Sequence, residues 1–245
     1  MLFSILGSSN SWQETLGLLL LTIPCILIAL IAHELGHGIM ALWCGDKTAK
    51  ETGRLTLNPA SHLDPVGTLM MLFVGIGWTK PIPVDSRRFR HPRFDFVLTS
   101  LAGPLSNIVT ALLAVFGYCA IVRYVPGYDG LTLTTIAGVG AYALQMLAVF
   151  NIGLALFNLI PLPPLDGSNI IMAFLPEKAR NKYAMVRFYL PWIFVGLVAI
   201  RYLGRFIPVF AQLEDYIWHP LTIAENWVFG KLLEIGQWLF FTVLG

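Results

Sequence analysis

The sequence predicts an all-α polytopic membrane protein with about four to six transmembrane helices and a short membrane-associated β or re-entrant segment. Two observations predict this class. Of the 245 residues, 56% are hydrophobic and only 12% are charged, whereas a typical soluble domain has about 25% charged residues. The apolar residues also form long blocks, such as Leu16–Ala32 and Ile136–Phe157, and about 20 apolar residues span the hydrocarbon core of a bilayer.

The positions of lysine and arginine indicate how the chain is oriented. Twelve of these 16 residues lie in three loops, at residues 47–54, 80–93 and 178–187. Because cytoplasmic loops carry an excess of Lys and Arg, all three loops are expected in the cytoplasm. Four crossings then follow, at about Leu16–Cys44, Phe96–Tyr124, Leu133–Leu159 and Phe188–Phe206.

Three further segments are less regular. The apolar stretch Val66–Trp78 has 13 residues, which suits a re-entrant or interfacial segment better than a span, although a short tilted span stays open. Gly53–Pro59 and Lys80–Val84 are expected to be short strands or extended edges near the membrane surface. The C-terminal segment 221–245 can cross the membrane or lie in its interface.

No loop is long enough to hold a second domain. We therefore expect one membrane-embedded domain over residues 1–245, with a catalytic core over about 16–172 and C-terminal helices over about 188–245. The net charge of +2 gives no reason to expect a nucleic-acid partner. The three cysteines show no paired spacing, so no disulfide framework is expected.

The chemistry of the chain centres on residues 33–37, which read HELGH inside an apolar helix. His33 and His37 are four residues apart, so both imidazoles face the same way, with Glu34 beside them. On a helix, H-E-x-x-H is typical of zinc metalloproteases, with two His ligands and the Glu as general base. A carboxylate deep in a membrane helix costs about 2.5–3.5 kcal/mol, which favours this function over histidines that only pack against a neighbouring helix.

A catalytic zinc needs a third protein ligand. Asp166, in FNLIPLPPLDGSN, is the best candidate, because proline-broken backbone at membrane depth lines protein or a watery cavity. Asp is also a common helix cap, and the residues alone support the cap and the ligand equally. His62 and Asp64 are the other candidates, either as groups that support the ligands or as surface residues.

Three motifs together resemble the site-2 protease family of intramembrane zinc metalloproteases. They are HELGH on an early helix, AGPLSN on a middle helix and NLIPLPPLDG at the end of a later one. Their order and spacing match over roughly Leu16–Met172. The resemblance implies that Asp166 is the third zinc ligand, and that Asn158 and Pro164 help to form the substrate site.

The middle motif contains Gly103 and Asn107, which match the family's small-residue motif. From the residues themselves, Gly103 predicts close helix packing, and Asn107 can add a hydrogen bond between helices. GRLTLNPASHLDPVG and GWTKPIP resemble the small bacterial branch, and the sequence contains no PDZ or CBS domain like those of larger members. The oligomeric state is left open.

The resemblance also implies the setting of the reaction. The expected cofactor is Zn²⁺, and the expected substrate is a transmembrane protein or peptide in the lipid bilayer, cleaved in regulated intramembrane proteolysis or in clearance of membrane stubs. The expected location is a bacterial cell membrane, and the Lys- and Arg-rich loops place the active site toward the cytoplasmic side.

Two other functions stay open at this point. A membrane metal transporter would use His33 and His37 as a transit site, but it gives no specific need for Glu34. A catalytically inactive membrane scaffold needs none of the motif.

Overall fold

The computed structural model describes residues 12–68, 79–126, 128, 130–131, 134–204 and 207–244. Within these ranges the chain is helical and has no named strand. Three of the described helices contain segments long and apolar enough to cross a membrane, at Thr15–Trp43, Pro92–Tyr124 and Ile136–Asn158. The expected polytopic all-α class is confirmed in this form.

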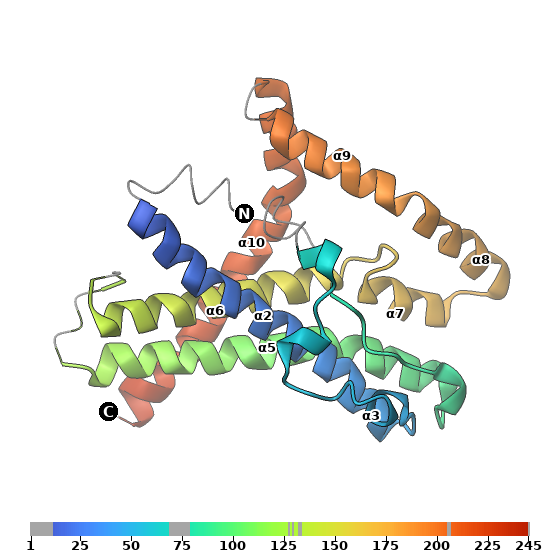
Figure 1. Cartoon of the computed structure of the whole chain (residues 1–245), viewed down its shortest axis with the longest axis horizontal. Helices are drawn as coiled ribbons and strands as arrows, with labels where there is room; N and C mark the ends of the chain where they lie inside the picture. The colour runs from blue at the N-terminus through green and yellow to red at the C-terminus, as the bar shows by residue number, and fades with distance from the viewer. Residues whose placement is uncertain are drawn as a thin grey trace.

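These segments belong to α2 (Trp12–Trp43), α5 (Pro92–Tyr124) and α6 (Ile136–Asn158). Figure 1 shows α5 and α6 side by side, with α2 crossing them and α7 lying at one end. The other elements of the described residues are α3 (Thr48–Glu51), η1 (Pro59–Ser61), η2 (Ser86–Arg88), α7 (Asp166–Phe174), α8 (Glu177–Met185), η3 (Val186–Phe188), α9 (Leu190–Leu203), α10 (Pro208–Gln237) and η4 (Trp238–Val243).

The remaining expected membrane segments are shorter or lie partly outside the described residues. The expected crossing at Phe188–Phe206 coincides with η3 and α9, and α9 has 14 residues, fewer than the about 20 that a span needs. Most of Val66–Trp78 lies outside the described residues, so its expected re-entrant path stays a prediction. The 221–245 segment continues α10 into η4.

The strand form expected for the two segments before and after Val66–Trp78 is wrong, and the extended-edge alternative stays a prediction. Neither Gly53–Pro59 nor Lys80–Val84 forms a strand, and the described part of this region contains one isolated bridge, between Leu63 and Thr79. Prolines explain much of this, because Pro81 and Pro83 have no N–H to donate to a ladder. A side chain joins the two segments instead: Arg54 Nη2 donates to the carbonyl oxygen of Lys80 at 2.7 Å.

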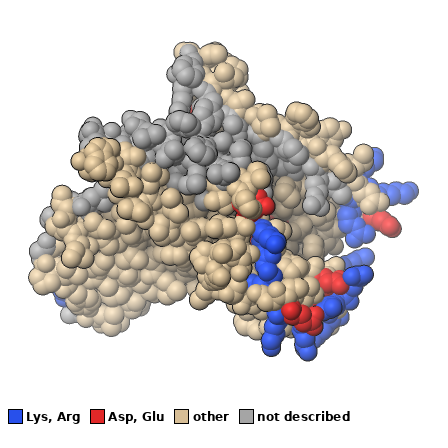
Figure 2. Space-filling view, viewed as in Figure 1, with Lys and Arg blue, Asp and Glu red and all other residues tan. Residues whose placement is uncertain are grey.

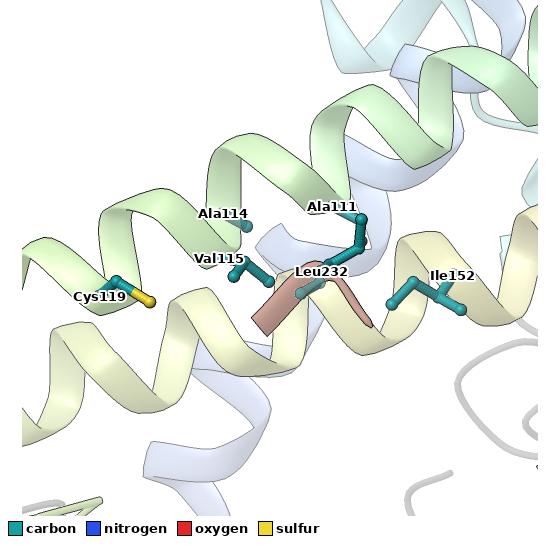
Figure 3. Close-up of a cluster of buried hydrophobic side chains, with 7 residues drawn as sticks. Ala111, Ala114, Val115, Cys119, Ile152 and Leu232 are labelled. Carbon is teal, nitrogen blue, oxygen red and sulfur yellow. The ribbon is translucent and has the colours of Figure 1, made fainter. Parts of the chain in front are cut away.

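Small side chains bring the central helices together. Ala111, Ala114, Val115 and Cys119 of α5, Ala148 and Ile152 of α6 and Leu232 of α10 form a buried cluster, and Figure 3 shows Leu232 pointing between α5 and α6. Alanines let helix backbones approach closely, which favours association inside a membrane. The cluster packs α5, α6 and α10 together.

A fully buried carboxylate ties the residues after position 79 to the end of α2. Asp46 Oδ2 accepts a hydrogen bond from the backbone N–H of Asp85 at 2.7 Å, and its Oδ1 accepts one from the N–H of Thr48 at 2.9 Å. Hydrogen bonds from the Arg87 side chain and backbone lower the pKa of Asp85 to about 2. Asp85 therefore stays ionised and caps η2 at neutral pH.

Candidate active site

Two helices bring together three side chains that can hold a metal ion. His33 and His37 lie on α2, and Asp166 is the first residue of α7. Asp166 Oδ2 lies 3.1 Å from His33 Nε2 and 3.2 Å from His37 Nε2, and the two Nε2 atoms are 3.1 Å apart. Ligand atoms about 2.0–2.1 Å from a tetrahedral zinc are about 3.3 Å apart, so the three atoms fit one zinc ion.

The hydrogen bonds of the two imidazoles decide what these atoms can bind. His33 Nδ1 lies 2.7 Å from Asn107 Oδ1, and His37 Nδ1 lies 2.7 Å from the carbonyl oxygen of Thr99. A carbonyl oxygen only accepts, so each Nδ1 carries a proton, and in the neutral imidazole that binds a metal each Nε2 presents a lone pair. The Asn107 amide is oriented because its Nδ2 donates to the carbonyl oxygen of Ala29 and to Asn151 Oδ1, both at 2.8 Å.

With both imidazoles neutral, three acceptor atoms therefore face one another without a donor between them. Asp166 Oδ2 is buried and accepts no hydrogen bond from the described residues. Such an arrangement is repulsive by itself and favourable around a cation. The donor set of two neutral imidazoles and one carboxylate is one that zinc uses in catalytic sites.

Asn107 supplies a direct test of this assignment. Asn107→Leu removes the acceptor for His33 Nδ1, and loss of such an outer partner lowers metal affinity by about 10- to 100-fold. Asn107→Asp keeps an acceptor at that point and is expected to retain more of the affinity. Competition with a zinc chelator measures both variants, and equal affinities in the two would contradict the proposed tautomer of His33.

Asp166 does not act as a helix cap. The N-cap of α7 is Leu165, and the cap has no side-chain hydrogen bond. Gly167 explains how α7 comes so near to α6, because a Cβ at that position would overlap the carbonyl of Leu159. The glycine after Asp166 thus lets the start of α7 pack on the end of α6, with the carboxylate turned to α2.

Glu34 is held by the segment that follows residue 78. Its Oε1 accepts a hydrogen bond from Thr79 Oγ1 at 2.8 Å, and its Oε2 accepts one from the backbone N–H of Ile82 at 2.9 Å. The side chain is buried within α2. Both carboxylate oxygens are therefore fixed beside the histidines by a segment more distant in the sequence.

One cavity of about 300 Å³ joins these groups to the substrate-site candidates. Its lining includes His33, Glu34, His37 and Asp166 together with Asn158 and Pro164. Asn158 Nδ2 donates to the carbonyl oxygen of Leu154 at 2.9 Å, so one of its two amide hydrogens is used within α6. The cavity is large enough for a few residues of an extended peptide.

His62 and Asp64 do not join this group. His62 Nε2 donates to the carbonyl oxygen of Thr56 at 2.7 Å, and Asp64 Oδ1 accepts from the N–H of Gly67 at 2.8 Å. Both side chains are therefore engaged in local structure around η1. Among the described residues, the group of His, Cys, Asp and Glu side chains close enough to hold a metal is His33, His37 and Asp166.

Some contacts of the site could not be expected from the motifs. Asn151 has one sequence signal, since it is an amide inside the apolar stretch 136–158 and such residues bond to a neighbouring helix. Thr99 and Ile82 act through backbone atoms, which carry no signal in the sequence. Thr79 gives no signal because its partner, Glu34, lies 45 residues away.

Gly103 packs against the histidine rings themselves. A Cβ at this position would overlap Nε2 of His37 and lie 2.8 Å from Cε1 of His33. Gly103 therefore lies directly against the two imidazole rings of α2. The absent side chain leaves room for both imidazoles between α2 and α5.

Gly103→Ala is therefore expected to displace a ring and to lower bound zinc. Gly117→Ala is a matched control on the same helix, because its Cβ would meet the end of the flexible Leu144 side chain at 3.1 Å. Metal analysis of the two purified variants measures the effect. Full zinc content in Gly103→Ala would mean that the rings can shift without losing the metal.

Family comparison agrees with this arrangement. The sequence matches peptidase family M50 over residues 21–203. This range contains the two histidines, Glu34 and Asp166. The chain belongs to peptidase family M50. The site-2 protease resemblance is thereby confirmed.

Two similar proteins are both named as zinc metalloproteases. "Putative zinc metalloprotease YwhC" of Bacillus subtilis (strain 168) is 40% identical over 184 residues, which are 68% of this chain and 76% of the relative. "Putative zinc metalloprotease Rip2" of Mycobacterium tuberculosis H37Rv is 30% identical over 219 residues, 86% of this chain and 80% of the relative. No solved structure matches the chain.

Proposed function

We propose that this member of family M50 is an intramembrane zinc metalloprotease that hydrolyses peptide bonds within or near transmembrane segments of membrane proteins. One observation carries the proposal: three acceptor atoms without a donor converge beside the buried carboxylate of Glu34 in one cavity. His33, His37 and Asp166 hold the zinc, and Glu34 is the general base. The names of the relatives support the same reaction.

Each group at the site has its own role in peptide hydrolysis. Bound zinc supplies Lewis-acid polarisation of the scissile carbonyl and lowers the pKa of a water to about 7. Glu34 accepts the proton of the attacking water and passes it to the leaving amine. Asn158 donates its free amide hydrogen to the substrate carbonyl or backbone. Ile82 and Thr79 keep the carboxylate of Glu34 aimed into the cavity.

The substrate is a membrane-spanning protein or peptide that unwinds at the scissile bond. A helical substrate commits its backbone hydrogen bonds, so the bond becomes accessible only in an extended form. Pro164 and Asn158 line the cavity where that form binds.

We further propose that residues 1–245 form one domain, with its catalytic core over about 16–172. This domain crosses the membrane about four to six times, and Val66–Trp78 is its re-entrant segment.

The site faces the cytoplasm in this proposal. Figure 2 shows Lys and Arg gathered around α3, η2 and the start of α5, and again around α8, and such residues concentrate on the cytoplasmic side of a bacterial cell membrane. Cysteines placed at Lys50, Arg88 and Lys182 are expected to resist a membrane-impermeant thiol reagent in intact cells and to react in inverted vesicles. Labelling of the Arg88 position from outside would reverse the orientation of the helices that follow it.

The reaction is tested by proteomics of membrane fractions. Cells with the wild-type chain are compared with cells that carry Glu34→Gln. Transmembrane fragments that accumulate only with the variant support the proposal and identify substrates. Identical fragments in both strains, under conditions in which the purified wild-type chain cleaves nothing, would refute it.

A further inference from the structure

The last long helix lies at the depth of the membrane spans. Trp218 of α10 stacks on Phe157 near the end of α6, and Phe240 of η4 packs edge-on against Tyr124 at the end of α5. Figure 1 shows α10 running obliquely across both helices between these points. The 22 steps along the chain from Trp218 to Phe240 cover about 33 Å, close to the thickness of a hydrocarbon core.

One face of α10 is covered by the protein and the opposite face is not. Leu232 and Gly236 are buried against α5 and α6. The uncovered face carries large apolar side chains: Ile223, Trp227, Ile235, Trp238 and Phe241. An apolar face would suit lipid, and by itself it needs no partner.

Two charged side chains on that uncovered face do not suit lipid. Lys231 Nζ lies 2.8 Å from Glu234 Oε2, and the two side chains are 52% and 64% exposed. They flank Leu232, which packs among residues near the middle of α5. Charged side chains at such depth face protein or water rather than acyl chains, because their exposure to hydrocarbon is costly.

We propose that this uncovered face of α10 is the contact between two copies of the chain. The charges on this face indicate that its partner is a second copy of the chain. The face presents one cation and one anion three residues apart, so it is complementary to itself: a two-fold axis places Lys231 of each copy beside Glu234 of the other. Trp227 and Trp238 lie on either side of the pair and provide the large anchors that interfaces favour.

Charge reversal tests the contact. The wild-type chain is expected to give energy transfer between donor- and acceptor-labelled copies in dilute proteoliposomes, with two bleaching steps for each assembly. Lys231→Glu alone and Glu234→Lys alone each place like charges across the axis and are expected to give single-step bleaching. An equal mixture of the two variants restores opposite charges and is expected to recover paired copies, as is the double reversal in one chain.

The controls separate this contact from a folding defect. Lys178→Glu on the exposed surface of α8 makes the same charge change away from α10 and is expected to leave pairing intact. The mixture uses two variants that fail alone, so recovery in it cannot come from misfolded chains. Single-step bleaching of the wild type, or unchanged pairing in both single variants, would overturn the proposal. The outcome is independent of the proposed protease reaction, because it requires no substrate.

Discussion

Replacing Glu34 by Gln is expected to remove cleavage of a transmembrane substrate while the purified chain keeps its zinc. General acid–base catalysis contributes about 10²- to 10⁴-fold to a rate, and an amide cannot accept the proton. The fold has a place for the new side chain: Oε1 of Gln can accept from the N–H of Ile82, and its amide N–H can donate to Thr79 Oγ1. Single-turnover cleavage of a model substrate, with zinc measured on the same sample, gives both quantities.

His37→Ala is the comparison for that result. It removes a proposed ligand and is expected to lower both zinc content and cleavage, whereas Glu34→Gln lowers cleavage alone. This difference distinguishes the base from a ligand although the two residues are three positions apart on α2. If Glu34→Gln cleaved at the wild-type rate, the base would be another group in the cavity.

Asp166→Asn is expected to cause a severe loss of both zinc and cleavage. Asn caps helices about as well as Asp, and the start of α7 has no side-chain cap in any case. The substitution therefore leaves the helix intact and removes the anionic oxygen that lies 3.1 Å and 3.2 Å from the two Nε2 atoms. The loss in zinc affinity is expected to exceed the about 10- to 100-fold that removal of an outer partner costs.

Asp166→Glu provides the informative contrast. It keeps the charge on an arm longer by one methylene, and zinc accepts sites of two His and one Glu, so residual binding and cleavage are expected. Bound zinc and cleavage in detergent rank the wild type first, the Glu variant second and the Asn variant last. Near-normal zinc in the Asn variant would exclude Asp166 from the site.

The local part of the site was predictable from the sequence. Helix periodicity places His33 and His37 on one face of α2, and this needs nothing beyond the spacing within one helix. The apolar blocks likewise predict α5 and α6 nearly to their observed ends. Such inferences succeed because each depends on residues that are neighbours along the chain.

The rest of the site depends on which segments meet in space. The residues alone supported Asp166 equally as a helix cap and as a metal ligand. In the structure, the packing of the start of α7 against the end of α6 turns its carboxylate to the histidines. The strand form expected for Gly53–Pro59 and Lys80–Val84 was wrong, because Pro81 and Pro83 have no N–H for a ladder. The Arg54 side chain joins the two segments instead. The hydrogen bonds on Glu34 could not be predicted, since one of them comes from the backbone of Ile82.

The facing lone pairs of His33, His37 and Asp166 also bear on how the chain assembles. Without a metal ion, these three atoms can stay together only if a proton lies between the carboxylate and an imidazole. A zinc ion held by His33, His37 and Asp166 would take the place of that proton. It would cross-link α2 to α7 and close a loop of about half the chain, at an entropic cost that grows only slowly with loop length. The metal would then stabilise the folded chain as well as serve its chemistry, and its removal is expected to loosen the contact between α2 and the start of α7.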